Sequence, residues 1–302
     1  MKKKDYLLSW TVSAICIFVI FSGLPEARGA MPADPPVRLI LRCDDIGMTH
    51  AVNVAIKRVI ESGLPVSTSV MFVCPWYQEA VDILKAHPEV TVGIHLTLNA
   101  EWKNYRWGPI VGDYTAPSLV DSCGYFFPSR ASFEANHPAI DEIEKELQAQ
   151  IERGLASGLK IDYVDYHMST AVSTPEYRKL VEKLAIEHGL GISRYFGEVD
   201  APGIYSLPPS IKPDSLVAIV KSLPADRLNL LVFHLGLENT EMDAMIDLNS
   251  FGLPNMSRHR NGELNALMSA SFRNTLQMGK YHLMTYREVI REVSLANMKS
   301  PE

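Results

Sequence analysis

The sequence predicts an α/β protein, a TIM-barrel-like ring of about seven βα units that is either closed or incomplete. Short apolar segments alternate with segments of helical apolar period along most of the chain, which is typical of parallel strands covered by helices. Polar residues recur where these apolar segments end, and βα barrels carry their functional groups at the C-terminal ends of their strands. An open doubly wound sheet is the alternative that this pattern allows.

Strands are expected where a short apolar run ends at polar residues, glycine or proline. Seven such runs occupy residues 37–45, 67–73, 90–99, 161–167, 191–196, 228–236 and 281–286. Amphipathic segments between them predict helices over residues 50–62, 77–88, 138–158, 175–189, 262–279 and from 287 onward. Thr49 can cap the first helix and Gly63 can end it.

The alternation stops after the third strand, where residues 100–137 form an aromatic-rich insertion. Its aromatic side chains stand among glycines and prolines and include Trp102, Tyr105 and Trp107. A loop of this length inside a compact domain is usually functional. The insertion could line a sugar site, or it could be a packed surface subdomain, and the sequence leaves both open.

Residues 1–29 are predicted to be a signal peptide, and residues 30–302 a single domain. Three lysines precede an apolar stretch over residues 6–21, and small residues follow at the expected cleavage site. The apolar stretch is short for a bilayer span, although an uncleaved anchor is the alternative. We therefore expect an exported protein, periplasmic or secreted, with no membrane attachment after cleavage.

The composition excludes some partners. The formal net charge of −6 becomes more negative without residues 1–29, because four basic and two acidic side chains are lost. An acidic exported chain is a poor candidate for nucleic acid or anionic membranes. The remaining cysteines, Cys43, Cys74 and Cys123, are an odd number and predict no disulfide framework, although one bridge stays open. The sequence also leaves open whether the chain forms a homodimer.

Two adjacent aspartates, Asp44 and Asp45, follow the first strand in the segment LRCDDIGMTH. Neighbouring carboxylates repel each other unless a cation or a proton compensates them. Histidines stand at other strand ends, at His95, His167 and His234. In a βα barrel these side chains would meet at one face.

Two histidines and a carboxylate suit a catalytic divalent metal ion, because three protein ligands leave positions open for water and substrate. A single histidine at a strand end is more often simply hydrogen-bonded, but several that converge would be costly to bury unpaired. The sequence contains no GxGxxG, Walker or GxSxG motif. Metal-assisted hydrolysis is therefore the leading reaction class.

Several of these segments resemble the YdjC-like carbohydrate deacetylases, the chitooligosaccharide and hopanoid-associated deacetylase group. The similar segments, in matching order over residues 37–293, are LRCDDIGMTHAVNVAI, VGIHLTLN, YVDYHMST, LLVFHLG and YHLMTYREV. The resemblance implies a TIM-barrel-like fold and hydrolytic removal of N-acetyl groups from an amino sugar or oligosaccharide. It also implies a divalent metal ion, Zn²⁺ or Mg²⁺, as cofactor.

The same resemblance assigns roles to residues. Asp45, His95 and His167 would hold the metal, Asp44 would be the general base, and His234 the general acid. Asp44 could instead cap the following helix. The chain departs from the family pattern at two positions, since Leu235 replaces a proline after His234 and Ser169 stands where many members have a histidine.

Two further residues have open interpretations. Asp165 could orient His167 from behind, or be a strand-end residue bonded to backbone. Arg194 could meet a sugar hydroxyl or the acetyl oxygen, or be a salt-bridged rim residue. Two other functions also remain: a phosphodiesterase-like metal hydrolase, which a second metal would favour, and a non-catalytic glycan-binding barrel that uses the aromatic insertion.

Overall fold

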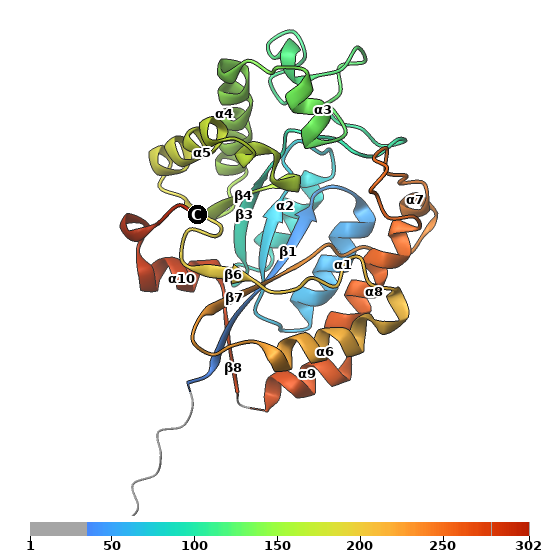
Figure 1. Ribbon diagram of the computed structural model, residues 1–302, viewed down its shortest axis with the longest axis vertical. Coiled ribbons are helices and arrows are strands. Elements are labelled where there is room, and N and C mark those ends of the chain that lie inside the picture. Colours follow the sequence, from blue (N-terminus) through green and yellow to red (C-terminus); the bar gives the residue numbers. More distant parts are fainter. Residues whose placement is uncertain (1–34, 279, 302) are drawn as a thin grey trace, which may run out of the picture. The chain divides into compact units, whose positions relative to one another are not determined.

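A parallel sheet forms the centre of the structure, a computed structural model that describes residues 35–278 and 280–301 (Figure 1). The predicted signal peptide lies outside these residues. The strands are β1 (Val37–Ile46), β2 (Ser67–Val70), β3 (Thr91–Leu96), β4 (Ile161–Tyr166), β5 (Gly191–Ile192), β6 (Glu198–Asp200), β7 (Leu228–Phe233) and β8 (Tyr281–Met284).

The strand order is that of a βα barrel left open at one place. The sheet runs β5-β4-β3-β2-β1-β7-β6, and every pairing in it is parallel. In a closed ring β5 would pair with β6, but in the described part of the chain these two short strands are the sheet edges. β8 pairs with the first half of β1, over Val37–Ile40. The prediction of an incomplete, TIM-barrel-like fold is therefore confirmed.

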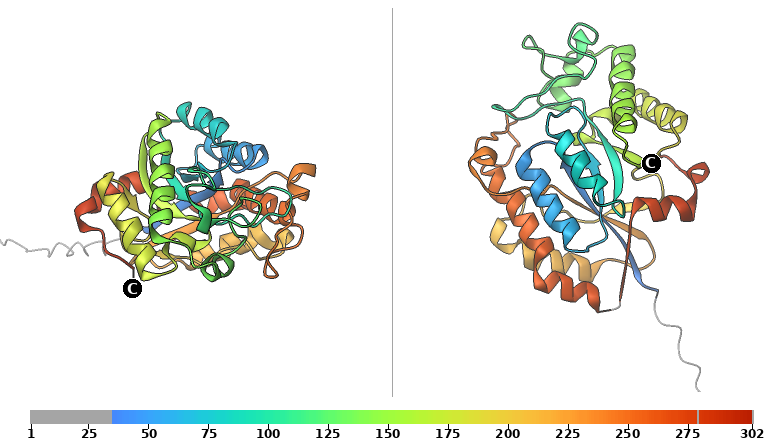
Figure 2. Two further views of the ribbon diagram at one scale, coloured as in Figure 1. Left: turned by 90° about the horizontal axis from the view of Figure 1, so that it is seen from above. Right: turned by 180° about the vertical axis from the view of Figure 1, so that it is seen from behind.

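Most of the helices cover the outside of the curved sheet, whereas α3 lies in the segment between β3 and α4 (Figure 2). They are α1 (His50–Glu61), α2 (Tyr77–Lys85), α3 (Arg130–Ala135), α4 (Ile140–Ala156), α5 (Pro175–Glu187), α6 (Lys212–Ser222), α7 (Thr240–Asp243), α8 (Met256–Met268), α9 (Ala270–Gln277) and α10 (Tyr286–Val293). Thr49 caps α1 as predicted, since its side chain accepts a hydrogen bond from the Val52 backbone N–H. None of the helices in the described residues is long and apolar enough to cross a membrane.

Several elements differ from the sequence prediction, and β6, α3, α6 and α7 were not predicted. The strand expected over residues 191–196 stops at Ile192, because Arg194 takes a left-handed backbone conformation with φ 72°. The helix expected over residues 262–279 is two helices, α8 and α9, separated where Ser269 turns extended and caps α9. The first turn of α6 contains a proline, which suits a helix start.

The insertion between β3 and α4 lies over the C-terminal ends of the strands (Figure 1). It is anchored there by Tyr105, whose hydroxyl donates to the Met48 carbonyl at the end of β1 at 2.6 Å. Trp102 and Trp107 are buried, whereas Tyr114 is fully exposed. The insertion is therefore partly core and partly rim of the barrel mouth.

The barrel interior is filled at one point by an aromatic ring that depends on a glycine. Tyr163 of β4 lies against Gly93 of β3, and a Cβ at Gly93 would be 2.5 Å from the Tyr163 ring. The Tyr163 hydroxyl lies 3.0 Å from the Thr68 carbonyl and 3.1 Å from Ser69 Oγ, and the ring stacks on Tyr286 at 4.3 Å. The ring cannot move away without breaking these contacts.

We expect Gly93→Ala to lower the free energy of unfolding by about 1–3 kcal/mol, the usual cost of overpacking a filled core. Urea unfolding measures the change. Gly203→Ala is the matched control, because a Cβ at Gly203 meets no atom within 4 Å. Equal stabilities of the two variants would show that the Tyr163 ring yields freely.

Candidate metal centre and active site

The two adjacent aspartates share one face because β1 is irregular at its end. In a regular strand, successive side chains point to opposite faces. The register of β1 against β2 shifts between Cys43 and Ile46, and Asp45 takes a left-handed conformation with φ 70°. Such a bulge re-aims a side chain and often stands beside an active site. Both carboxylates are buried, with 3% and 0% of Asp44 and Asp45 exposed.

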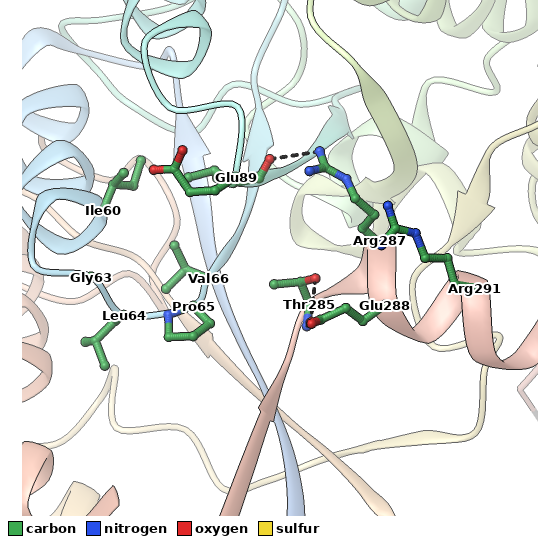
Figure 3. Close-up of a pocket in the computed structure, with 11 residues that line it drawn as sticks. Ile60, Gly63, Leu64, Pro65, Val66, Glu89, Thr285, Arg287, Glu288 and Arg291 are labelled. Carbon is green, nitrogen blue, oxygen red and sulfur yellow. Dashed lines mark hydrogen bonds between the residues drawn. The ribbon is translucent and has the colours of Figure 1, made fainter. Parts of the chain in front are cut away.

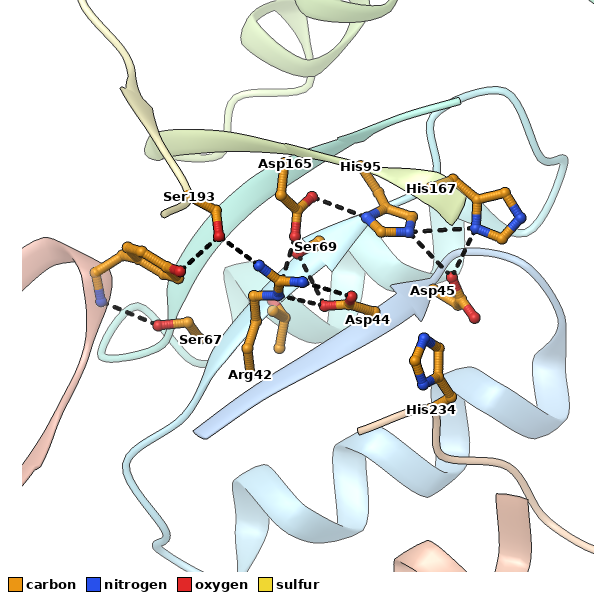
Figure 4. A network of polar contacts seen from close by, with 12 residues as sticks. Arg42, Asp44, Asp45, Ser67, Ser69, His95, Asp165, His167, Ser193 and His234 are labelled. Carbon is orange, nitrogen blue, oxygen red and sulfur yellow. Dashed lines mark hydrogen bonds and ion pairs between the residues drawn. The ribbon is translucent and has the colours of Figure 1, made fainter. Parts of the chain in front are cut away.

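Asp45, His95 and His167 form one tight group (Figure 4). The Asp45 Oδ1 atom lies 3.3 Å from His95 Nε2 and 3.5 Å from His167 Nδ1. The two imidazole nitrogens face each other at 3.3 Å. The Asp45 Oδ1 atom is buried without a hydrogen-bond partner, and Oδ2 faces Arg260 Nη2 at 2.8 Å. Three converging ligand atoms with free lone pairs fit a divalent metal ion.

Each histidine of the group is held from behind by a second carboxylate. Asp165 Oδ1 accepts from His95 Nδ1 at 2.8 Å, and Glu101 Oε2 accepts from His167 Nε2 at 3.0 Å. A hydrogen bond of this kind fixes the tautomer, so that the other ring nitrogen points to the centre. Asp165 therefore orients His95, a contact that matches neither interpretation left open by the sequence, which were a partner of His167 and a residue bonded to backbone.

Without a metal ion the surrounding carboxylates favour the protonated form of both imidazoles, so a metal ion that binds here displaces these protons. Burial alone would lower the pKa of His95, but Asp165 and Asp45 outweigh it and raise the pKa to about 10. Burial is likewise outweighed at His167, where Glu101 and Asp45 raise the pKa to about 9. Burial would raise the pKa of Asp45, but Arg260, whose Nη2 lies 2.8 Å away, and both imidazoles hold it well below the usual range.

Asp44 belongs to a neighbouring network built around Arg42 (Figure 4). The Arg42 guanidinium donates to both Asp44 oxygens at 2.7 and 2.8 Å, and to Ser193 at 2.6 Å. Its Nε also lies 3.1 Å from Asp165 Oδ2. Asp44 is thus held by a buried bidentate ion pair and does not cap α1, whose cap is Thr49.

The Arg42 guanidinium also decides how many metal ions the site suits. Asp44, His95 and Asp165 form a second group with metal-like spacing. Its two carboxylates already face Arg42, so a second cation there would lie against a buried positive charge. The described residues therefore fit one metal ion and not two.

His234 follows β7 and lies across from the metal-binding group (Figure 4). Its ring rests 5.1 Å from the Tyr205 ring, and its Nδ1 has no hydrogen-bond partner. Burial lowers the pKa of His234 to about 4, against the opposing charges of Asp45 and Asp44. The Glu263 carboxylate accepts from the His234 backbone N–H at 2.6 Å and fixes the turn. Leu235, which follows, is fully buried.

Two cavities meet at His234 and Met168, which line both. One, of about 330 Å³, is also lined by His167, Glu101 and Arg260 together with residues of the insertion. The other, of about 240 Å³, is also lined by Asp44, His95, Ser169 and Arg194. His167 therefore faces one cavity and His95 the other, with His234 in the wall of both.

Arg194 lies on the rim of the smaller cavity. Its guanidinium makes a bidentate ion pair with Asp200 at 2.7 and 2.9 Å and lies over the Tyr166 ring. Of the two interpretations that the sequence allowed, the salt-bridged rim is the one with a contact in the structure. A third cavity, lined by Arg287 and Glu89, lies near the N-terminal ends of β2 and β3, away from this site (Figure 3).

Three charged residues of the site, Arg42, Glu101 and Arg260, were not predicted from the sequence. Arg42 lies two residues before Asp44 on β1, so the two side chains point to the same face of the strand. A charged residue inside an apolar strand could have indicated that Arg42 belongs to the site. Glu101 and Arg260 come from the insertion and α8, and no periodicity marks them. The sequence left open whether one disulfide joins two of the cysteines. Cys43, Cys74 and Cys123 are free in the described residues.

We expect Glu101→Gln to weaken metal binding by about 10- to 100-fold, because such partners orient the ligand and raise its basicity. Metal titration of chelator-treated protein measures the affinity. Glu79→Gln is the matched control, since Glu79 makes the same kind of contact to the surface His50, at 2.7 Å. Equal affinities of the two variants would contradict the role given to Glu101.

The fold and the site define an incomplete βα-barrel protein with a buried Asp–His–His group that could hold a metal ion, at the C-terminal ends of its strands. A comparison with protein-family models is more specific, because the family described as YdjC-like protein matches residues 38–278. The chain belongs to this YdjC-like family.

Curated relatives share part of the chain. A carbohydrate deacetylase of Brevibacillus brevis is 34% identical over 50% of this chain and 57% of its own. Carbohydrate deacetylase 1 of Listeria innocua is 28% identical over 56% of this chain and 67% of its own. The chain spans only about half to two thirds of the length of these relatives.

A solved structure shares the fold. It is named as a candidate cellobiose-phosphate cleavage protein of Enterococcus faecalis, with a TM-score of 0.68 and 22% sequence identity. The match covers 84% of this chain and 99% of that one. At this identity the likeness supports the barrel architecture alone.

Proposed function

We propose that this protein is a metal-dependent hydrolase that removes N-acetyl groups from an amino sugar or an oligosaccharide. The observation that carries the proposal is the buried Asp45, His95 and His167 group, whose His167 lines one cavity and whose His95 lines another beside Asp44. The names of the curated relatives support the same reaction and substrate class.

We propose Asp45, His95 and His167 as the metal ligands and zinc as the better candidate than magnesium. Ligand atoms in a tetrahedral shell with bonds of 2.0–2.1 Å are about 3.3 Å apart, and in an octahedral magnesium shell about 2.9 Å apart. The separations of 3.3 to 3.5 Å here fit the former. Two imidazoles also suit zinc better than magnesium.

The bound metal ion would polarise the acetyl carbonyl and make a bound water more acidic. Asp44 is proposed as the general base that takes the water proton, with Arg42 fixing both of its oxygens. His234 is proposed as the acid that protonates the leaving nitrogen. The burial that lowers its pKa to about 4 makes its imidazolium a strong proton donor that is scarce at neutral pH.

Arg42 argues against the phosphodiesterase-like alternative, because it fills the place where a second metal would sit. A non-catalytic glycan-binding barrel would have no use for a strained Asp45 whose buried Oδ1 converges with two imidazole nitrogens and has no hydrogen-bond partner. We further propose that the chain is exported by its N-terminal segment.

The protein from residue 30 onward is incubated with three classes of substrate. These are N-acetylated sugars and their short β-linked oligomers, O-acetylated sugars, and a phosphodiester. Acetate is measured enzymatically and free amine by derivatisation. The proposal expects acetate and amine in equal amounts from N-acetylated substrates. Cleavage of the phosphodiester would instead support a phosphodiesterase-like hydrolase. Sugar binding without turnover in the metal-loaded protein would support a non-catalytic glycan-binding barrel.

A further inference from the structure

Arg260 is a buried cation with unused donors at the wall of the larger cavity. The residue lies on α8, is 2% exposed, and pairs with Asp45 through Nη2 at 2.8 Å. Its Nε and Nη1 atoms are also buried and have no hydrogen-bond partner. A buried N–H without a partner costs about 1–3 kcal/mol, so a ligand that supplies an acceptor here would bind favourably.

The surroundings indicate which kind of ligand that is. Arg260 lines the cavity of about 330 Å³ together with His167 and His234. Its guanidinium lies 5.8 Å from the centre of the Trp102 ring, which covers one face and leaves the N–H edge for hydrogen bonding. Arg260 therefore lines the same cavity as the proposed metal ligand His167 and the proposed acid His234, the cavity in which we place the reacting amide.

We propose that Arg260 is a further catalytic residue, which donates hydrogen bonds to the acyl oxygen of the substrate as negative charge develops on it. This inference rests on the proposed deacetylase function. Preorganised donors aimed at a developing oxyanion in a site that excludes water are often the largest single contribution to catalysis. A guanidinium is suited to it, because it stays charged and presents several donors in a fixed plane.

Hydrolysis of the N-acetyl group needs no proton from Arg260. Water adds to the carbonyl carbon, one proton goes to the general base, and the C=O π electrons move onto the oxygen that Arg260 faces. The C=O bond re-forms as the C–N bond breaks, and the nitrogen takes a proton. The products are acetate and the sugar amine. Arg260 stabilises the charge on oxygen throughout and is itself unchanged.

Arg260→Lys tests this role, because it keeps a positive charge beside Asp45 but loses the planar set of donors. We expect kcat to fall about 100- to 1,000-fold, the usual cost of one oxyanion donor, with KM and metal affinity within a few-fold of wild type. The defect should shrink at least tenfold on an N-trifluoroacetyl substrate, whose oxyanion needs less stabilisation. Arg153→Lys is the matched control, since Arg153 lies over Tyr77 in the same way on α4.

Other outcomes would overturn the inference. A raised KM with unchanged kcat would make Arg260 a contact to the resting substrate. Metal affinity that falls together with kcat would make it only a positioning residue for Asp45. If the lysine variant does not fold, Arg260→Ala is assayed with and without added guanidinium. A kcat that guanidinium fails to restore would contradict the role given to Arg260. A wild-type protein without acetate release would refute the proposed function itself, and this inference with it.

Discussion

Asp44→Asn is expected to lower kcat for acetate release by about 100- to 10,000-fold, the usual contribution of a general base. Asparagine keeps the shape of the side chain and one acceptor for Arg42, but it cannot take a proton from water. Metal affinity should stay unchanged, because Asp44 is outside the Asp45, His95 and His167 group. Steady-state kinetics and metal titration of the same preparation measure both quantities.

Asp162→Asn is the matched control for this variant. Asp162 lies at the opposite end of the barrel, near the start of β4, and is also held by an arginine, Arg287, at 2.8 Å. The control should keep full activity. An Asp44→Asn variant as active as the control would assign the base to another residue.

Asp45→Asn is expected to abolish metal binding at micromolar concentrations and acetate release with it. Asparagine tolerates the left-handed conformation of this position better than most residues, so the backbone should survive the change. Arg260, however, would keep a buried charge without a partner, which typically costs about 3–5 kcal/mol. Metal titration and urea unfolding of the metal-free protein measure the two effects.

The loss of metal binding and the loss of stability caused by Asp45→Asn can be separated. The double variant Asp45→Asn with Arg260→Gln should recover stability, because the unpaired charge is gone, but it should not recover metal binding. Wild-type metal affinity in Asp45→Asn would remove the residue from the proposed ligands.

The strands of the barrel could be predicted because each is an apolar run with a clear end. β1, β3, β4 and β7 lie within one to three residues of the expected boundaries. The end of β5 and the presence of β6 could not be predicted, because they depend on packing at the open edge and on the strained backbone of Arg194. The β-propensity of single residues does not determine between which strands a barrel stays open.

The candidate site could be predicted as far as the residues at strand ends. Parallel strands bring their C-terminal ends to one face, so Asp45, His95 and His167 meet once the fold is known. The partners that set their charge and orientation could not be predicted. Arg42 and Glu101 act through pairings across the fold, and the bulge that turns both aspartates inward leaves no mark in the local sequence.

The central claim is that one metal ion, held by Asp45, His95 and His167, supports hydrolysis of an N-acetyl sugar. The most direct measurement is acetate release by chelator-treated protein as zinc is added in known equivalents per chain. The account predicts no activity without metal, a linear rise, and a plateau at one equivalent. Full activity in the metal-free protein, or a rise that continues to two equivalents, would contradict it.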